Sequence, residues 1–177
     1  MKSNYEIRAR RFAHQIYPYV TDCKTVSDYH RAISRFNCEH NRKVRVANGE
    51  TRVVLITSDY VLKIDYGNKQ KRYGGCADEY LAYQKVRRDG FSHLFAKIAP
   101  VMVNEMVFYV MPRVDKIGAE YNDYDDVYET YGLTEEESDY LSENFYDLHH
   151  ENYGHMHGHV VVVDYAFSSR VYEVRHR

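Results

Sequence analysis

The sequence lacks the features that mark secreted, membrane and repeat proteins. Its three cysteines are an odd number, lie far apart and form no paired motif, which argues against a disulfide framework and favours reduced thiols. No apolar stretch approaches the roughly 20 residues that a membrane-spanning helix needs, so no membrane partner is expected. The first residues, MKSNYEIRARRF, hold no apolar segment of the signal-peptide type. These absences predict a soluble, cytoplasmic protein.

Charge is unevenly spread along the chain, although the net charge is only -2. Residues 1–114 carry +9, residues 115–151 carry -12 and residues 152–177 carry +1. The acidic block is most simply a solvated face, but it could also dock a basic protein surface or imitate nucleic acid. Direct binding of nucleic acid is not expected. Hydrophobic residues make up 44% of the chain, enough for one domain or for two small lobes that share a cleft.

Apolar spacing predicts helices at the start of the chain and strands after them. Residues 1–40 have helical spacing, with a polar break at Thr21–Lys24. From Lys43 onward the runs KVRVA, RVVLI and YVLKI are separated by turn sequences, which predicts an antiparallel meander. CADEYLAYQKVRRDG predicts a helix that ends at Gly90. FAKIAPVMV and MVFYVMP predict two more strands, joined by a turn at Asn104–Glu105.

The last third of the chain begins with an acid- and tyrosine-rich linker, residues 115–130. LTEEESDYLSENFYDL then predicts a helix, with Thr134 as N-cap and Glu137 at the capping-box position. Residues 147–167, DLHHENYGHMHGHVVVVDYAF, follow it. Their four consecutive valines predict a buried strand that ends at Asp164.

Three histidines alternate within this stretch, at His155, His157 and His159. On one face of a strand they could bind zinc or nickel, but no cysteine or carboxylate partner stands at a fixed spacing from them. A polar hairpin tip around Gly158 is the favoured interpretation.

The order of these elements resembles the protein kinase-like family. Five strands carry one helix inserted after the third strand, with Lys63 on that strand and Glu79 on the helix. DLHHEN, from Asp147 to Asn152, has the spacing of the kinase catalytic loop, and Asp164 stands where that family has its metal-binding Asp-Phe-Gly motif. The resemblance implies an α+β protein kinase-like fold whose five-stranded antiparallel N-lobe sheet has one inserted helix.

In this layout residues 1–40 form an N-terminal helical extension and residues 41–113 the N-lobe. Residues 114–177 form a truncated C-lobe with one helix and a catalytic-loop β-hairpin. The family's internal stack of side chains corresponds here to three aromatic residues, Tyr83, Phe145 and Tyr165.

The resemblance also implies ATP and Mg²⁺ as cofactors of a phosphoryl transfer, which depends on positioning and charge neutralisation. Lys63 would hold the α- and β-phosphates and pair with Glu79. The nucleotide would further contact Val61, Gly49, Met111 and Val114.

On the other side of the implied site, Asp147 would orient the acceptor hydroxyl and accept its proton. His149 stands where many protein kinases have a lysine near the transferred phosphate. Asn152 and Asp164 would hold Mg²⁺ through hard oxygen ligands.

Three features depart from the family pattern. VANGETRVV offers only Gly49 in place of a three-glycine loop, which leaves fewer backbone N–H groups for the phosphates. Tyr146 replaces the arginine that precedes the catalytic aspartate, so activation by loop phosphorylation is not expected. The sequence continues for only 13 residues after Asp164, too few for an activation segment.

The compact layout and the segment DYAFSSR resemble the early protein kinases of short-tailed lytic bacteriophages. That resemblance implies a serine/threonine kinase whose partners are host proteins, including the transcription and RNA-processing machinery. Two alternatives stay open at this point. One is a kinase-like binding module that inhibits a host protein through its acidic face, and the other is a small-molecule kinase, suggested by the DLHxxN form of the loop. Substrate identity, oligomeric state and the role of residues 1–40 are likewise open.

Overall fold

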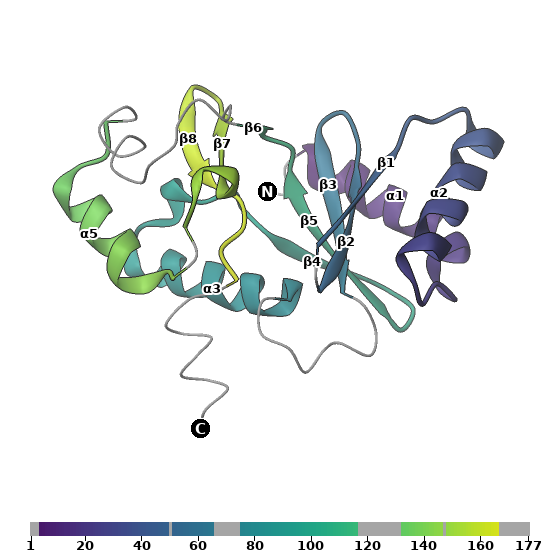
Figure 1. Cartoon of the computed structure of the whole chain (residues 1–177), viewed down its shortest axis with the longest axis horizontal. Helices are drawn as coiled ribbons and strands as arrows, with labels where there is room; N and C mark the ends of the chain where they lie inside the picture. Colours follow the sequence, from purple (N-terminus) through teal and green to yellow (C-terminus); the bar gives the residue numbers. More distant parts are fainter. Residues whose placement is uncertain (1–3, 50, 66–74, 117–131, 147, 167–177) are drawn as a thin grey trace. The chain divides into compact units, whose positions relative to one another are not determined.

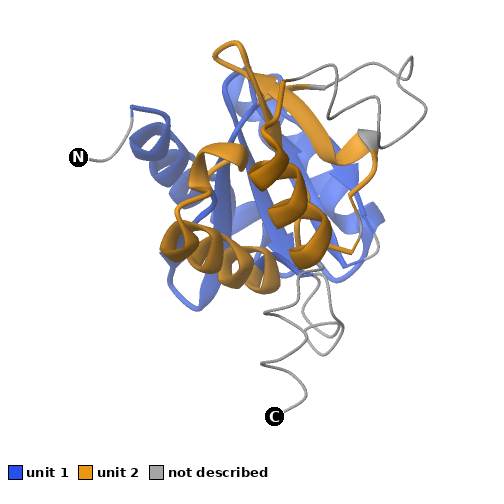
Figure 2. Cartoon of the chain, turned by 90° about the vertical axis from the view of Figure 1, so that its left-hand side faces the viewer, with its two compact units in different colours: residues 1–76, 98–113 blue, residues 77–97, 114–177 orange. Residues whose placement is uncertain are grey.

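The computed structural model describes residues 4–49, 51–65, 75–116, 132–146 and 148–166 (Figure 1). The chain divides into two compact units, residues 1–76 with 98–113 and residues 77–97 with 114–177 (Figure 2). The first unit thus holds both the N-terminal helices and the large sheet. Among the described residues, no helix combines the length and apolar character that a bilayer span requires.

The first unit is built on a five-stranded antiparallel sheet with the order β1-β2-β3-β5-β4. Its strands are β1 (Arg45–Asn48), β2 (Arg52–Ile56), β3 (Tyr60–Asp65), β4 (Ala99–Val103) and β5 (Met106–Pro112). The predicted meander and the turn at Asn104–Glu105 are confirmed, and Asn104 has a φ of 51° in that turn. The fourth strand begins at Ala99 rather than at Phe95, because the backbone of Phe95 and Ala96 bonds instead to Val162 in the second unit's own fold.

Two helices cover one face of this sheet, α1 (Asn4–Val20) and α2 (Val26–His40), as Figure 1 shows. The polar break between them ends in a capping box, in which Thr25 and Asp28 each bond the other's backbone N–H. The last turn of α2 closes with Asn41 in the left-handed region, at φ 49°. Both predicted helices are therefore confirmed, and their cores pack on the sheet.

Alternation along β3 separates the two faces of the sheet. Tyr60, Leu62 and Ile64 belong to the apolar core formed with α1 and α2. Because successive side chains on a strand point to opposite faces, Val61 and Lys63 lie on the other face. The predicted nucleotide-binding lysine is thus on the face away from the N-terminal helices.

Among its described residues, the second unit contains two α-helices and a three-stranded sheet with the order β6-β7-β8. Its elements are α3 (Cys76–Asp89, whose first residue belongs to the first unit), η1 (Ser92–Leu94), β6 (Asp115–Lys116), α5 (Glu135–Asn144), η2 (His150–Asn152), β7 (Tyr153–Met156) and β8 (His159–Val162). The helix predicted from CADEYLAYQKVRRDG and the hairpin predicted after Asn152 are both present. The short strand β6 was not predicted, since residues 115–130 read as a linker in the sequence.

Helix α5 begins as predicted but ends earlier. Thr134 and Glu137 form the predicted capping box. The helix stops at Asn144 instead of Leu148, because Phe145 takes an extended conformation and buries its ring 4.9 Å from that of Phe95. Asn144 compensates by donating a hydrogen bond from Nδ2 to the Tyr140 carbonyl oxygen, at 2.9 Å.

Polar contacts hold α5 against α3 within the second unit. Lys85 Nζ donates to Asp89 Oδ2 at 2.6 Å and to Asn144 Oδ1 at 2.8 Å. The Tyr140 hydroxyl also donates to Asp89 Oδ2, and its ring stacks on that of Phe91 with centroids 4.0 Å apart. Burial, and then this hydrogen bond to Asp89, raises the pKa of Tyr140 above its usual range, so the hydroxyl stays protonated as a donor.

Candidate functional site

The face of the sheet opposite α1 and α2 brings three of the predicted nucleotide-site residues together. Val61 on β3 lies directly across from Met111 on β5, and Lys63 lies across from Tyr109. Met111 is 2% exposed and Lys63 6% exposed, and Lys63 has an interaction partner. A lysine buried to this degree needs a compensating charge or hydrogen bond. Both a catalytic lysine and a purely structural one would meet that requirement.

Glu79 lies in the first turn of α3 and is fully buried. It too has an interaction partner. Lys63 and Glu79 fall in different units, and their pairing stays a prediction.

The start of α3 is fixed by a residue that the sequence did not single out. The Cys76 N–H donates to Asp65 Oδ1 at 2.7 Å, so a carboxylate at the end of β3 caps the first turn of α3. Gly75 makes this approach possible, because a Cβ there would lie 3.3 Å from both carboxylate oxygens of Asp65. The only sequence signal was an aspartate ending a strand before a Gly-Gly pair.

Gly49 lies in the β1–β2 connection, where the predicted phosphate loop would be. Its N–H donates to the Arg52 carbonyl oxygen at 3.0 Å, inside the hairpin. That N–H is therefore occupied by the hairpin itself, which leaves little backbone donor capacity for a phosphate at this glycine.

Hairpin β7–β8 places Asn152 and Asp164 at the same end of one supersecondary unit. The register pairs Tyr153 with Val162, and the Val163 N–H donates to the Asn152 carbonyl oxygen at 2.8 Å. Asp164 follows Val163 directly, so the two predicted metal ligands leave the hairpin side by side. Asn152 is 7% exposed and Asp164 is half-buried.

The catalytic-loop residues before the hairpin are placed in part. The His149 carbonyl oxygen accepts from the Asn152 N–H at 2.8 Å, which closes the short turn η2. His149 itself is half-buried, and Leu148 is buried. Asp147, the predicted proton acceptor, lies outside the described residues.

Val114 was predicted to contact the nucleotide, and it packs against the hairpin. A Cβ added to Gly154 would lie within 3.0 Å of the Asp115 carbonyl oxygen and closer still to Val114. Gly154 is thus required by close packing where β6 pairs with β7, and not by an unusual backbone angle.

The three alternating histidines lie in and on either side of a tight turn. His157 and Gly158 have φ angles of 54° and 82°, which form the two-residue hairpin tip expected around Gly158. His155 and His159 are exposed on the flanking strands. Within the described part of the chain, no three His, Cys, Asp or Glu side chains are grouped so that they could hold a metal ion.

The three aromatic residues of the predicted stack are linked through a fourth. Tyr83 and Tyr165 have ring centroids 6.4 Å apart, and the ring of Phe95 lies 5.1 Å from Tyr165 and 4.9 Å from Phe145. The Tyr165 hydroxyl donates to the Ala96 carbonyl oxygen at 2.5 Å. The stack thus joins α3, the segment before the catalytic loop and the residue after Asp164. Phe95 was missed because its run read as a strand.

Comparison with known proteins finds only distant structural similarities. No protein-family model matches the sequence, and no curated protein does. Solved structures that resemble part of the chain include the Legionella pneumophila Lpg2603 kinase bound to IP6, which is 13% identical and has a TM-score of 0.40. That match covers 75% of this chain and 62% of the other.

A second similar structure is the streptomycin-ATP-APH(2")-IIa ternary complex, which is 17% identical with a TM-score of 0.30. It matches 64% of this chain and 36% of the other. The chain therefore spans less than two thirds of either solved chain. At such low identity and TM-score, these similarities assign no activity to it.

Proposed function

We propose that this chain is a kinase-like phosphotransferase that moves the terminal phosphoryl group of ATP to a protein hydroxyl. The observation that supports it best is the β7–β8 hairpin, which places Asn152 and Asp164 together through the 2.8 Å bond between the Val163 N–H and the Asn152 carbonyl oxygen. The amide and the carboxylate on these adjacent strand ends both offer oxygen atoms that could coordinate a cation.

These two side chains suit Mg²⁺. That ion prefers oxygen ligands and is commonly held by one or two protein groups, while substrate phosphates and water fill the other positions. When bound, it would neutralise charge on the phosphates. The backbone of Asn152 is fixed on both sides, by the His149 carbonyl oxygen and by the Val163 N–H, so the position of its Cα is set without a ligand present.

Lys63 would bind the α- and β-phosphates and Glu79 would hold Lys63 in position. The apolar pair Val61 and Met111, on the same face as Lys63, would contact the base of the nucleotide. Asp147 would take the proton of the acceptor hydroxyl as its oxygen bonds to the terminal phosphorus and the bond to ADP breaks. His149 would stand beside the transferred group.

The acceptors that we propose are serine and threonine hydroxyls of host proteins, with the chain acting as a phage-type kinase during host takeover. The supports are the compact layout, the segment DYAFSSR and Tyr146 in place of the usual arginine. Transcription and RNA-processing proteins are the first substrates to test.

The experiment is transfer of labelled phosphate from ATP to the chain itself and to a bacterial lysate. Asp164→Ala and Asn152→Ala should each lower transfer at least about 100-fold, equivalent to about 2.7 kcal/mol of transition-state stabilisation. His155→Ala, an exposed change on the same hairpin, is the matched control and should keep wild-type transfer. Equal activity in Asp164→Ala and the control would reject the proposal.

A second candidate function is a binding module with this fold and no catalysis. The engaged N–H of Gly49 favours it, because a weak phosphate loop would matter less to a scaffold. Exposed Glu135, Glu136 and Asp139 on α5 would then supply the acidic contact surface. Glu135→Lys with Glu136→Lys should abolish capture of a basic host partner while the transfer-deficient Asp164→Ala retains it. Glu137 should stay unchanged, because it caps α5 and bonds to His93.

A further inference from the structure

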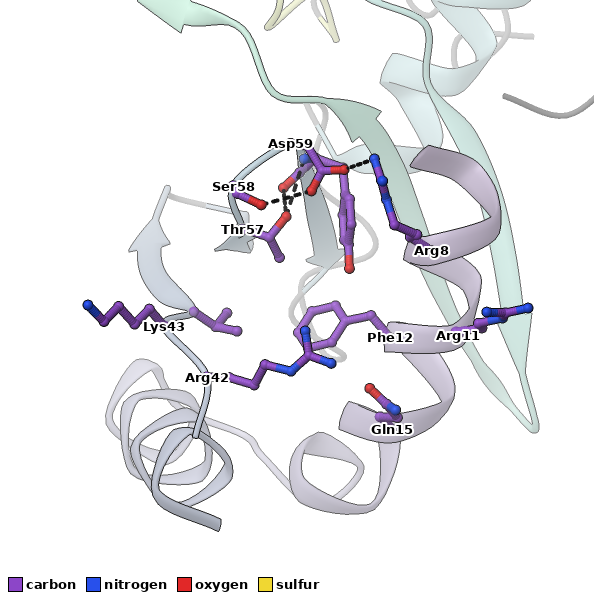
Figure 3. A pocket seen from close by; sticks show the side chains of 11 residues that line it. Arg8, Arg11, Phe12, Gln15, Arg42, Lys43, Thr57, Ser58 and Asp59 are labelled. Carbon is purple, nitrogen blue, oxygen red and sulfur yellow. Dashed lines mark hydrogen bonds and ion pairs between the residues drawn. The ribbon is translucent and has the colours of Figure 1, made fainter. Parts of the chain in front are cut away.

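A pocket lined by four basic side chains lies in the first unit, between α1, the segment after α2 and the β2–β3 turn (Figure 3). Its volume is about 730 Å³, a size typical of small-molecule sites. The basic residues are Arg8 and Arg11 from α1, and Arg42 and Lys43 from the segment that leads into β1. Among the described residues of the lining, Asp59 is the one carboxylate.

These cations are poorly neutralised by the described residues. Arg8 forms an ion pair with Asp59. No carboxylate in the described ranges pairs with Arg11, Arg42 or Lys43. Arg42 thus faces the concavity without a carboxylate partner among the described residues, and Arg11 and Lys43 lie at its rim, where they make the local potential positive.

The floor of the pocket adds an uncharged donor. Tyr60 is 7% exposed, and both Arg8 and Arg42 act electrostatically on its hydroxyl. Burial, and then the nearby Asp59, keeps the pKa of Tyr60 above its usual value despite the two arginines, so the hydroxyl remains protonated. In Figure 3 the side chain of Arg42 extends toward Phe12, while Arg11 and Lys43 extend outward on opposite sides.

The backbone that carries these groups is held in place before any ligand binds. Asn37 fixes the segment after α2 through two side-chain bonds to the backbone of Val44, at 2.8 and 3.0 Å. In the β2–β3 turn, Thr57 Oγ1 donates to the Tyr60 carbonyl oxygen at 2.7 Å, and the Arg113 N–H donates to the Asp59 carbonyl oxygen at 3.0 Å. A preformed site loses less ordering entropy on binding.

The pocket is separate from the proposed catalytic site. Tyr60 is on the face of β3 that packs against α1 and α2, whereas Lys63 is on the opposite face. A ligand in the pocket would therefore not contact Lys63.

We propose that this pocket binds a small molecule that carries two or more clustered phosphate groups. Guanidinium groups match phosphate oxygens in a two-pronged geometry, and a single phosphate would fill only part of a volume of about 730 Å³. Arg42, Arg8 and the Tyr60 hydroxyl would contact the innermost phosphate, and Arg11 and Lys43 would turn inward from the rim to meet the outer ones.

The test is calorimetric titration of the full chain with inorganic tripolyphosphate. Arg42→Gln should weaken binding about tenfold or more, equivalent to about 1.4 kcal/mol, since a charged hydrogen bond is lost. Arg45→Gln, on the neighbouring strand and outside the pocket, is its control. Arg11→Gln should also weaken binding. Its control is Arg10→Gln, one residue away on α1 and outside the lining, which should leave binding unchanged.

The double variant Lys63→Met with Glu79→Leu separates the pocket from the catalytic proposal. It should abolish phosphate transfer and leave tripolyphosphate affinity as in the wild type. If this double variant stays folded and loses tripolyphosphate binding while Arg42→Gln does not, the anion occupies the nucleotide site and the pocket proposal is wrong. The proposal also fails if tripolyphosphate does not bind saturably below about 1 mM, an affinity of about 4 kcal/mol. A single-stranded oligonucleotide that outcompetes it, with equal losses in Arg10→Gln and Arg11→Gln, would show a diffuse nucleic-acid surface instead.

Discussion

The two faces of the five-stranded sheet differ in the kind of side chain that they bury. The face under α1 and α2 is mainly apolar, with Val53, Leu55, Leu62 and Phe108 each completely buried. The opposite face carries charged residues that are also buried, Arg52 at 7% exposure and Lys63 at 6%. Apolar burial stabilises a fold directly, whereas a buried charge costs free energy unless it is paired. Packing therefore accounts for the first face, whereas on the second the interactions of Arg52 and Lys63 must offset the cost of burying their charges.

The largest expected effect tests whether the charged face depends on pairing. On the proposed pairing of Lys63 with Glu79, Lys63→Met and Glu79→Leu should each lower the free energy of unfolding by about 3–5 kcal/mol, because each would leave the other charge buried without its partner. The double variant should be close to wild type in stability, or above it, and inactive in phosphate transfer. Urea denaturation of the four proteins gives the coupling energy, and purely additive losses would contradict the pairing.

On the apolar face, Leu62→Ala should lower the free energy of unfolding by about 2–5 kcal/mol, since it leaves a cavity beneath α1 and α2. Met102→Ala, on an exposed side chain of the same sheet, is the control and should stay within about 0.5 kcal/mol of wild type. Equal stability of the two variants would show that the helix-covered face is not a packed core.

The same contrast between packing and function recurs in the β7–β8 hairpin, at a smaller scale. Gly154→Ala should lower the free energy of unfolding by about 1–3 kcal/mol, because the added methyl group meets Val114 and the Asp115 carbonyl oxygen. His155→Ala, the next residue along and exposed, should have almost no effect. Thermal unfolding of both variants checks this, and a neutral Gly154→Ala would show that β6 shifts easily.

The smallest expected effect is on the pH dependence of stability, through Asp28 in the capping box of α2, one of the helices that cover the apolar face. Hydrogen bonds from the side chain and backbone of Thr25 lower the pKa of Asp28 to about 2. Because the folded pKa is below the unfolded value of about 3.9, the contribution is complete above that value and disappears as the pH falls toward 2. Melting temperatures between pH 7 and pH 2.5 should fall less in Asp28→Asn than in wild type, with Asp22→Asn as control. Parallel curves for Asp28→Asn and wild type would contradict it.

Local patterns were enough to predict most of the fold. Alternation gave the meander, and the Thr134 and Glu137 pair gave the start of α5. The end of α5 and strand β6 were missed, because burial of Phe145 and pairing with β7 are tertiary effects that override local propensity. Fixed spacing predicted that Asn152 and Asp164 share one hairpin.

Features made by segments far apart in the sequence could not be predicted. The basic pocket joins Arg8 and Arg11 to Arg42 and Lys43, and no spacing rule relates two helical positions to a loop some thirty residues later. Phe95, between Tyr165 and Phe145, was hidden for the same reason. The engaged N–H of Gly49 depends on hairpin geometry that a residue count does not reveal.

The hydrogen bond between the Asp65 carboxylate and the Cys76 N–H bears on how well the protein tolerates inserted residues between these two positions. Both ends of the intervening stretch are pinned at that bond, on one side to the strand of Lys63 and on the other to the helix of Glu79. Doubling the number of residues between such anchors adds only about 0.6 kcal/mol of closure entropy. Insertions between these two anchors should therefore cost little of the free energy of unfolding.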